Sequence, residues 1–108
     1  MNLFIKVIWF HQEIEDPVLL YSELDQSKFE KRKIELFRNG KIGLADTELE
    51  LNSMLGICEV PPLTEINMNP EFFGFEINKD EFECVWNDAL QKLNVNKWTR
   101  DRKCQLEE

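Results

Sequence analysis

Apolar and polar positions alternate along the first forty residues with the two-residue period of β-strands. Residues 3–10 are largely apolar on both faces, which indicates a strand in the interior of a sheet. Residues 18–24 predict a second strand, with Tyr21 on one face and most of the aliphatic side chains on the other. Residues 28–38 predict a third strand with two mixed faces, one of which holds Glu30, Arg32, Ile34, Leu36 and Arg38.

The dipeptide Asn39-Gly40 separates the third strand from another strand-like run that begins at Lys41. Asn-Gly between two such runs is a strong hairpin signal, because both central positions of a type I′ turn need a positive φ. We therefore expect a hairpin closed by that turn.

Weaker patterns follow the hairpin. Residues 46–53 alternate leucines with acids and predict either an edge strand or an extended loop. Residues 63–68 have room for one helical turn, which Asn69-Pro70 would end. Residues 71–77 again alternate and predict a late strand.

The clearest helical pattern follows Asn78, a good N-cap residue with Glu81 three positions later. Its apolar stripe at helical spacing consists of Phe82, Val85, Trp86, Ala89, Leu90 and Leu93. Strands followed by one such helix predict an α+β fold, an antiparallel β-sheet with one main C-terminal helix packed on a face.

The domain organisation follows from these patterns. We expect a single α+β domain over residues 1–93 and a polar C-terminal tail over residues 94–108, in which Trp98 is the one large aromatic ring. Trp9 on the first strand and Trp86 on the helix stripe are expected to be neighbours in the core.

Several short motifs together resemble those of a family of short bacterial proteins. They are Lys6-Val7-Ile8-Trp9 with His11, Tyr21-Ser22-Glu23-Leu24-Asp25, Glu30 with Arg32-Lys33-Ile34-Glu35, Leu63 with Glu65-Ile66-Asn67, and Glu81-Phe82 with Trp86. The resemblance covers about residues 5–90, and that family carries an unknown-function label. It implies one domain of bacterial, cytosolic origin and assigns no residue roles.

Charge changes the picture, because its signs are sorted along the chain. Residues 42–91 hold eleven acids against one base, Lys79, a net charge of −10 in a chain of net charge −8. The bases gather at residues 28–41 and 97–103. Such an acidic protein repels nucleic acid and membrane surfaces and attracts a basic partner. In size and acidity it resembles the immunity proteins that neutralise bacterial toxins in contact-dependent growth inhibition.

The sequence predicts no cofactor, metal or membrane segment. Its N-terminal apolar run, Val7 to Phe10, is shorter than a signal-peptide core or a membrane span, so we expect a cytoplasmic protein. Three widely spaced cysteines, Cys58, Cys84 and Cys104, and a single histidine predict neither a disulfide framework nor a zinc site. The four glycines stand apart, so no phosphate-binding loop is expected.

His11 is the one candidate for acid–base catalysis, since Glu13, Glu15 and Asp16 follow it closely. The other interpretation is a strand-end histidine bonded to the backbone, and we expect that the protein is not an enzyme. The bases of residues 28–41, interleaved with Phe29 and Phe37, suggest either a nucleic-acid surface or cross-strand pairs with acids at 13–25 and 46–50. The net charge of −8 opposes binding to a polyanion and therefore favours the cross-strand ion pairs.

These observations favour a non-enzymatic, monomeric binding protein. We expect an immunity protein that masks the active site of a basic toxin, most plausibly a nuclease acting on RNA, with no direct nucleic-acid or membrane contact. The alternative is a stand-alone regulatory or scaffold domain with a peptide or small-molecule partner. Alternating acids at 46–50 predict a ridge backed by Leu49 and Leu51, and the expected toxin-binding residues are Asp46, Glu48, Glu50, Glu59, Glu13, Glu15 and Asp16.

Overall fold

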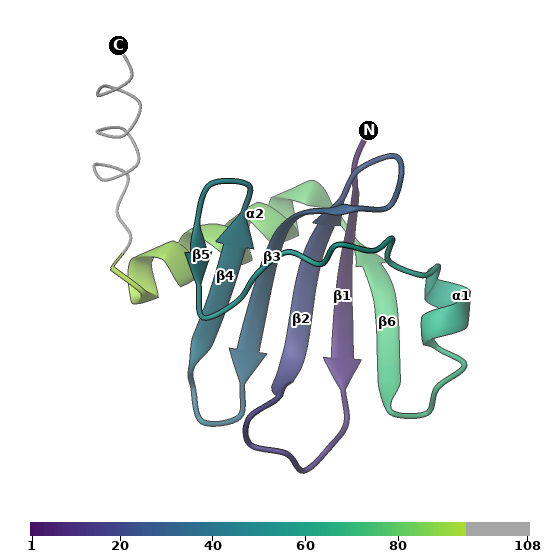
Figure 1. The fold of residues 1–108 in the computed structure, drawn as a ribbon, viewed down its shortest axis with the longest axis horizontal. Helices are drawn as coiled ribbons and strands as arrows, with labels where there is room; N and C mark the ends of the chain where they lie inside the picture. The colour runs from purple at the N-terminus through teal and green to yellow at the C-terminus, as the bar shows by residue number, and fades with distance from the viewer. Residues whose placement is uncertain (95–108) are drawn as a thin grey trace.

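A computed structural model describes residues 1–94 as one six-stranded antiparallel sheet with a long helix on one face (Figure 1). The strand order is β5-β4-β3-β2-β1-β6. The elements are β1 (Leu3–Trp9), β2 (Pro17–Leu24), β3 (Glu30–Phe37), β4 (Ile42–Asp46), β5 (Glu50–Leu51), α1 (Leu63–Ile66), β6 (Phe72–Ile77) and α2 (Lys79–Lys92). The α+β prediction is confirmed, and β1 is an interior strand between β2 and β6 as expected.

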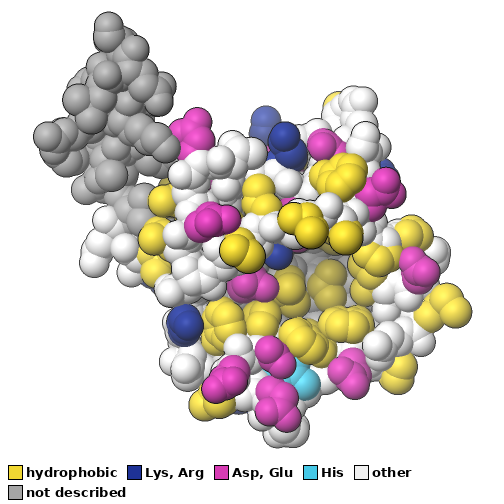
Figure 2. Space-filling view, viewed as in Figure 1, with side chains coloured by type: hydrophobic (Ala, Val, Ile, Leu, Met, Phe, Trp, Pro, Cys, Tyr) yellow, Lys and Arg dark blue, Asp and Glu magenta, His cyan; other side chains and the backbone are white. Residues whose placement is uncertain are grey.

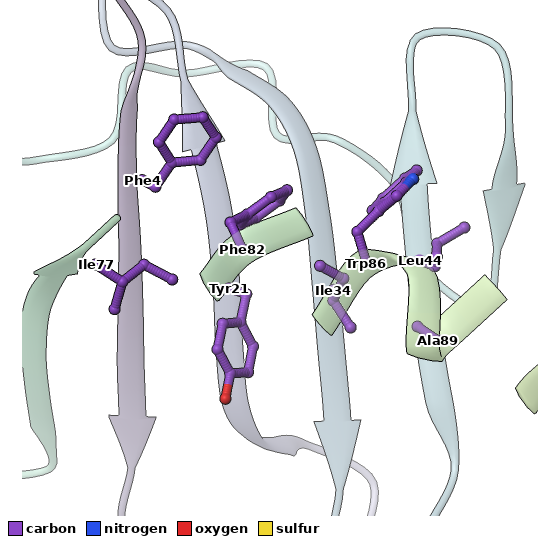
Figure 3. Close-up of a cluster of buried hydrophobic side chains, with 8 residues drawn as sticks. All are labelled: Phe4, Tyr21, Ile34, Leu44, Ile77, Phe82, Trp86 and Ala89. Atoms are coloured by element: carbon purple, nitrogen blue, oxygen red, sulfur yellow. The ribbon is translucent and has the colours of Figure 1, made fainter. Parts of the chain in front are cut away.

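The main core lies between α2 and the sheet (Figure 3). Asn78 caps the helix as predicted, because its side chain accepts the Glu81 N–H at 2.7 Å. Side chains of the apolar stripe meet one face of the four central strands. The buried residues of this core are Phe4, Tyr21, Ile34, Leu44, Ile77, Phe82, Trp86 and Ala89.

Arg32 joins α2 to the sheet by charge as well as by packing. Its guanidinium lies 4.8 Å from the Phe82 ring centre and bonds Glu23 at 2.5 Å and Glu83 at 2.6 and 3.0 Å. Burial alone lowers the pKa of Arg32, but these hydrogen bonds outweigh it and the pKa is raised. The hydrogen bonds from Arg32 hold the pKa of Glu83 below its ordinary value. The expected cross-strand pairing is therefore present for Arg32 and Glu23.

A register shift in β3 moves Glu30 to the opposite face from the predicted one. Glu23 pairs with Arg32, but Leu24 pairs with Glu30, so Lys31 is an extra residue as in a β-bulge. Because one added residue reverses the alternation, Glu30 leaves the face of Arg32. Its carboxylate instead pairs with Lys33 at 3.1 Å on the side away from α2.

The hairpin at Asn39-Gly40 is confirmed, but its turn is not type I′. Within the described chain, only Gly40 of these two residues has a positive φ, +91°. Gly40 N–H bonds the Phe37 carbonyl and Phe37 N–H bonds the Lys41 carbonyl, both at 3.0 Å. This is the three-residue loop in which a turn is followed by one left-handed glycine.

Trp9 and Trp86 lie on opposite faces of the sheet, so the expectation that they are core neighbours is wrong. Trp86 belongs to the core under α2, whereas the Trp9 ring lies 5.5 Å from that of Phe72 on the other face. The alternation of side chains along β1 requires this. Phe4 faces α2, so the even-numbered positions of the strand face α2 and the odd-numbered ones, including Trp9, face the other side. Trp98 and the tail over residues 95–108 lie outside the described residues.

The face away from α2 is crossed by residues 52–62, which we call the strap (Figure 1). Ser53 Oγ donates to Glu35 at 2.7 Å, Gly56 N–H to Glu30 at 2.6 Å, and Val60 N–H to the Lys28 carbonyl at 2.9 Å. The start of the strap can lie this close to β4 because Gly43 has no Cβ. A Cβ at this position would stand only 2.6 Å from the Asn52 carbonyl oxygen, too close for a real contact. It covers a smaller cluster centred on Ile5, Val7 and Leu24.

Both edges of the sheet are closed to further strands. β5 has two residues, and β6 is covered by the segment that contains α1. The Asn67 amide donates to the Gly74 carbonyl at 2.9 Å and accepts its N–H at 2.6 Å, which satisfies the backbone groups of Gly74 in the middle of β6. Neither helix of the described region is long and apolar enough to span a membrane.

Candidate functional site

The acids at 46, 48 and 50 do not form the predicted extended ridge. Asp46 ends β4, and its Oδ1 accepts the N–H groups of Glu48 and Leu49 at 2.8 Å each. The chain turns there, and Glu50 pairs back against Ala45 in β5. Asp46 thus shapes a turn, because aspartate readily bonds backbone donors two and three residues ahead. Leu49 and Leu51 do reach the core as expected.

The predicted toxin-binding residues are spread over three parts of the molecule. Glu13, Glu15 and Asp16 lie in the β1–β2 loop, Glu59 lies exposed on the strap, and the remaining three lie at the β4–β5 turn. The β1–β2 loop and the β4–β5 turn stand at opposite ends of the sheet (Figure 1). The seven acids therefore do not make one patch, and only the loop and the strap border the face away from α2.

His11 organises the β1–β2 loop. Its Nε2 lies 2.7 Å from the Pro17 carbonyl, and its Nδ1 accepts the Glu13 N–H at 3.0 Å. A carbonyl can only accept, so Nε2 carries the proton and the ring is the neutral tautomer with both nitrogens engaged. The Trp9 ring packs edge-on against it at 4.5 Å. This geometry fits the strand-end interpretation of His11.

A hollow of about 390 Å³ opens on the face away from α2, between the strap, α1 and the sheet (Figure 2). Its floor and walls are mainly apolar, and two carboxylates, Glu30 and Glu65, also line it. Its apolar lining residues are Ile5, Val7, Leu20, Val60, Pro61, Ile66 and Phe72. The volume falls within the range of about 300–1,000 Å³ that is usual for ligand sites.

Polar groups at one side of the hollow are already satisfied within the protein. The Glu30 side chain is 9% exposed and bonds Lys33, Gly56 N–H and, at 3.4 Å, the buried Ser22 hydroxyl. Together these contacts hold the strap on the sheet. Within residues 1–94, no group of three or more His, Cys, Asp or Glu side chains is placed to hold a metal ion.

Exposed apolar side chains occur on the two segments that border the hollow, the strap and the residues that follow α1. Met54 and Ile57 on the strap are 64% and 92% exposed, and Met68 after α1 is 81% exposed. Large apolar groups gathered near an apolar hollow are typical of interaction surfaces. We call the hollow with these three residues the binding face.

Acidic side chains surround the binding face. Figure 2 shows magenta carboxylates along the margins of the hollow, with the single histidine among those at its lower margin, and dark-blue bases beside them. One base, Arg38, donates a hydrogen bond to the His11 carbonyl of the β1–β2 loop. The two segments that frame it, residues 11–16 and 52–71, contain Glu13, Glu15, Asp16, Glu59, Glu65 and Glu71 and no Lys or Arg.

Sequence reasoning missed the hollow, because residues far apart in the chain build it. The strands that form its floor come from the first quarter of the sequence, and its roof and wall come from residues 60–72. The sequence holds a partial signal, because the apolar residues Val60, Pro61 and Leu63 do not belong to a sustained strand or helix pattern of apolar positions. Such residues are expected to pack against another part of the molecule.

Comparison with known families finds one match, a family model described as "Domain of unknown function (DUF6881)", over residues 3–91. This agrees with the resemblance expected over residues 5–90. Neither the curated proteins nor the solved structures that were compared include a match to the chain. The description of the matching family states no activity, so the surface of the chain is the remaining guide to its function.

Proposed function

The chain belongs to the DUF6881 family, for which no activity is described, and from its surface we propose that it is a non-enzymatic binding protein. Its partner is a basic protein, and in the most specific form of the proposal the chain is an immunity protein that masks the active site of a bacterial toxin. The carrying observation is the binding face, which joins an apolar hollow to six acids on the two segments that frame it, against which Arg38 is the base bonded to the β1–β2 loop.

The charge of the frame supports a cationic partner. Opposite charge speeds encounter by roughly 10- to 1,000-fold, and the acceleration falls as salt rises. The apolar hollow supplies what steering alone cannot, since contacts that exclude water slow the release of a bound partner. An inhibitor that protects a cell needs both fast capture and slow release.

A nuclease acting on RNA is the toxin class that this frame fits best. Enzymes that grip a polyanion present cationic clefts to it. Carboxylates of the β1–β2 loop and the strap would occupy positions where phosphates otherwise lie. Masking by charge mimicry requires no chemistry from the inhibitor, in agreement with a His11 ring whose nitrogens are both engaged by the backbone.

Growth rescue tests the proposal directly. Each neighbouring gene that encodes a basic candidate toxin domain is expressed under an inducible promoter, with and without the chain in the same cell. We expect growth only when the chain is present, and a stoichiometric complex on gel filtration that weakens at high salt. Failure of every neighbouring toxin candidate to bind the purified chain would contradict the immunity role.

The hollow also favours a second candidate function, a regulatory or scaffold domain with a small-molecule or peptide partner. Its volume of about 390 Å³ is sufficient for such a ligand. This candidate predicts binding without any rescue of growth, so the same experiment separates the two.

A further inference from the structure

We propose that the hollow is an anchor site, which takes one aromatic or large aliphatic side chain from a basic segment of the partner. This inference rests on the proposed function and adds the position and the chemistry of the central contact. In protein complexes, a few buried side chains inserted into pockets carry most of the binding energy. The hollow has the form that such a contact requires.

Rigid elements surround the hollow on all its closed sides. Ile5, Val7 and Leu20 of two paired strands make the floor, and the opposite face of those strands is fixed by the α2 core. Ile66 and Phe72 make the wall. A floor backed by a packed core does not collapse into the empty space, so a guest side chain meets a preformed site.

The roof is tied down by the sheet itself. Hydrogen bonds from Gly56 to Glu30 and from Val60 to the Lys28 carbonyl hold the strap above the floor. A second hollow of about 200 Å³ lies beyond Val60 and Pro61, and Ile5 lines both. The larger hollow alone, at about 390 Å³, has room for a side chain longer than alanine or valine.

Charge decides what surrounds the inserted side chain. Glu65 lines the hollow, and residues 11–16 and 52–71 add five further acids, so the acids of the frame outnumber Arg38, the base that bonds the His11 carbonyl. Lys33 is engaged by Glu30 and neutralises that carboxylate. A Lys- or Arg-rich segment is thus complementary to the frame, whereas a second copy of this chain, of net charge −8, is repelled.

The edges of the sheet exclude the other common way of binding a segment. An added strand would need free backbone groups on β6, and Asn67 already bonds both outward-facing groups of Gly74. Strand addition is therefore blocked at Gly74, which favours recognition through side chains in the hollow.

The test uses the ¹⁵N-labelled full chain and three short peptides of defined sequence. The first is Lys-Arg-Phe-Lys-Arg, the second replaces Phe by Ala, and the third replaces the bases by Glu and Asp. We expect the first peptide to shift the backbone signals of Ile5, Val7, Leu20, Val60 and Phe72. The Ala peptide should bind at least about tenfold more weakly, and the acidic peptide should cause no shift at these residues.

A second arm of the test changes the protein instead of the peptide, by filling the hollow with a larger side chain. Leu20→Trp places a ring in the hollow and should abolish these shifts, whereas Phe73→Trp enlarges a half-exposed ring of β6 away from the lining and should leave them unchanged. If Leu20→Trp does not fold, Val60→Phe fills the hollow from the strap. Equal binding of the Phe and Ala peptides, or unchanged binding by a folded, filled variant, overturns the anchor site.

The outcomes separate this inference from the function on which it rests. Growth rescue by the filled variants at the wild-type level would remove the anchor site and leave the immunity role standing. Peptide binding in the hollow without rescue by the wild-type chain would remove the immunity role and leave the site.

Discussion

Glu83 of α2 and Arg32 of β3 are joined by two parallel hydrogen bonds, Nη1 to Oε1 at 3.0 Å and Nη2 to Oε2 at 2.6 Å. The main helix is therefore fixed to the sheet at a defined point along its length, in addition to its apolar stripe. Because Arg32 also lies against the Phe82 and Trp86 rings, the ion pair is part of the core boundary rather than a surface contact.

This pair predicts a loss of stability in acid. The pKa of Glu83 is lower in the folded chain than its ordinary value of 4.5, so the folded state favours the charged carboxylate. Its contribution is complete above pH of about 4.5 and is lost as pH falls through the lower, folded-state pKa. Thermal unfolding of Glu83→Gln should begin at a lower temperature than the wild type at pH 7, and the difference should shrink as pH falls below the ordinary carboxyl pKa of 4.5.

A matched control for that prediction lies on the same helix. Asp88 pairs with Lys92 at 3.0 Å, but both side chains are more than half exposed. Asp88→Asn should change the melting temperature little at any pH, since exposed pairs contribute about 0–1 kcal/mol. Parallel pH profiles for Glu83→Gln and the wild type would show that the Arg32 pair does not stabilise the charged carboxylate.

Asn67 is predicted to protect the edge of the sheet. Asn67→Ala removes two hydrogen bonds and exposes the Gly74 backbone, which should cost about 1–3 kcal/mol of unfolding free energy and cause self-association that rises with concentration. Chemical denaturation and analytical ultracentrifugation measure the two effects. Asn67→Asp keeps the acceptor but loses the donor, so an intermediate result is expected.

The control for Asn67 is Thr64→Ala on α1, the short helix that ends just before Asn67, where the side chain is exposed. It should leave both stability and association unchanged. If Asn67→Ala stays monomeric and as stable as the wild type, then water satisfies the Gly74 N–H and carbonyl as well as the Asn67 side chain does.

His11 is predicted to be a structural residue. His11→Ala removes the bonds to the Pro17 carbonyl and the Glu13 N–H, and should lower the unfolding free energy by about 1–2 kcal/mol. Hydrogen exchange at the Glu13 amide should become faster, while toxin neutralisation persists. Lost neutralisation at an unchanged melting temperature would instead place His11 in a functional site.

The two ends of the sheet are predicted to differ in binding. Glu13→Gln, Glu15→Gln and Asp16→Asn together remove three charges beside the binding face, and Asp46→Asn, Glu48→Gln and Glu50→Gln remove three charges at the β4–β5 turn. The loop variant should slow association with the basic partner by about threefold to tenfold, with a weaker salt dependence. The turn variant changes the net charge equally and serves as its control. Equal on-rates for both would leave net charge, and not the frame, as the steering feature.

Local patterns predicted most of the sheet and its helix. The apolar alternation located four strands, and Asn78 with its stripe located α2, because these signals act over a few residues. The position of Glu30 was not predictable, since a bulge depends on pairing with β2 and leaves no mark on the alternation of β3 itself.

The candidate site was harder to predict for the same reason. The acids of the β1–β2 loop are exposed or half-buried. The acids at 46–50 were expected on an extended segment, but the chain turns at Asp46. The hollow required knowing that residues 52–62 cross the sheet. Nothing periodic in that segment indicates a crossing, because single contacts at Ser53, Gly56 and Val60 hold it.

These three widely spaced contacts separate the recognition surface from the requirements of folding. Two of them use the backbone of the strap, and the side chains between them at Met54, Ile57, Cys58 and Glu59 are exposed. We therefore expect substitutions there to cost little unfolding free energy and, if the proposed binding face is correct, to alter the choice of partner. A fold arranged in this way can acquire a new specificity one exposed residue at a time while its core stays the same.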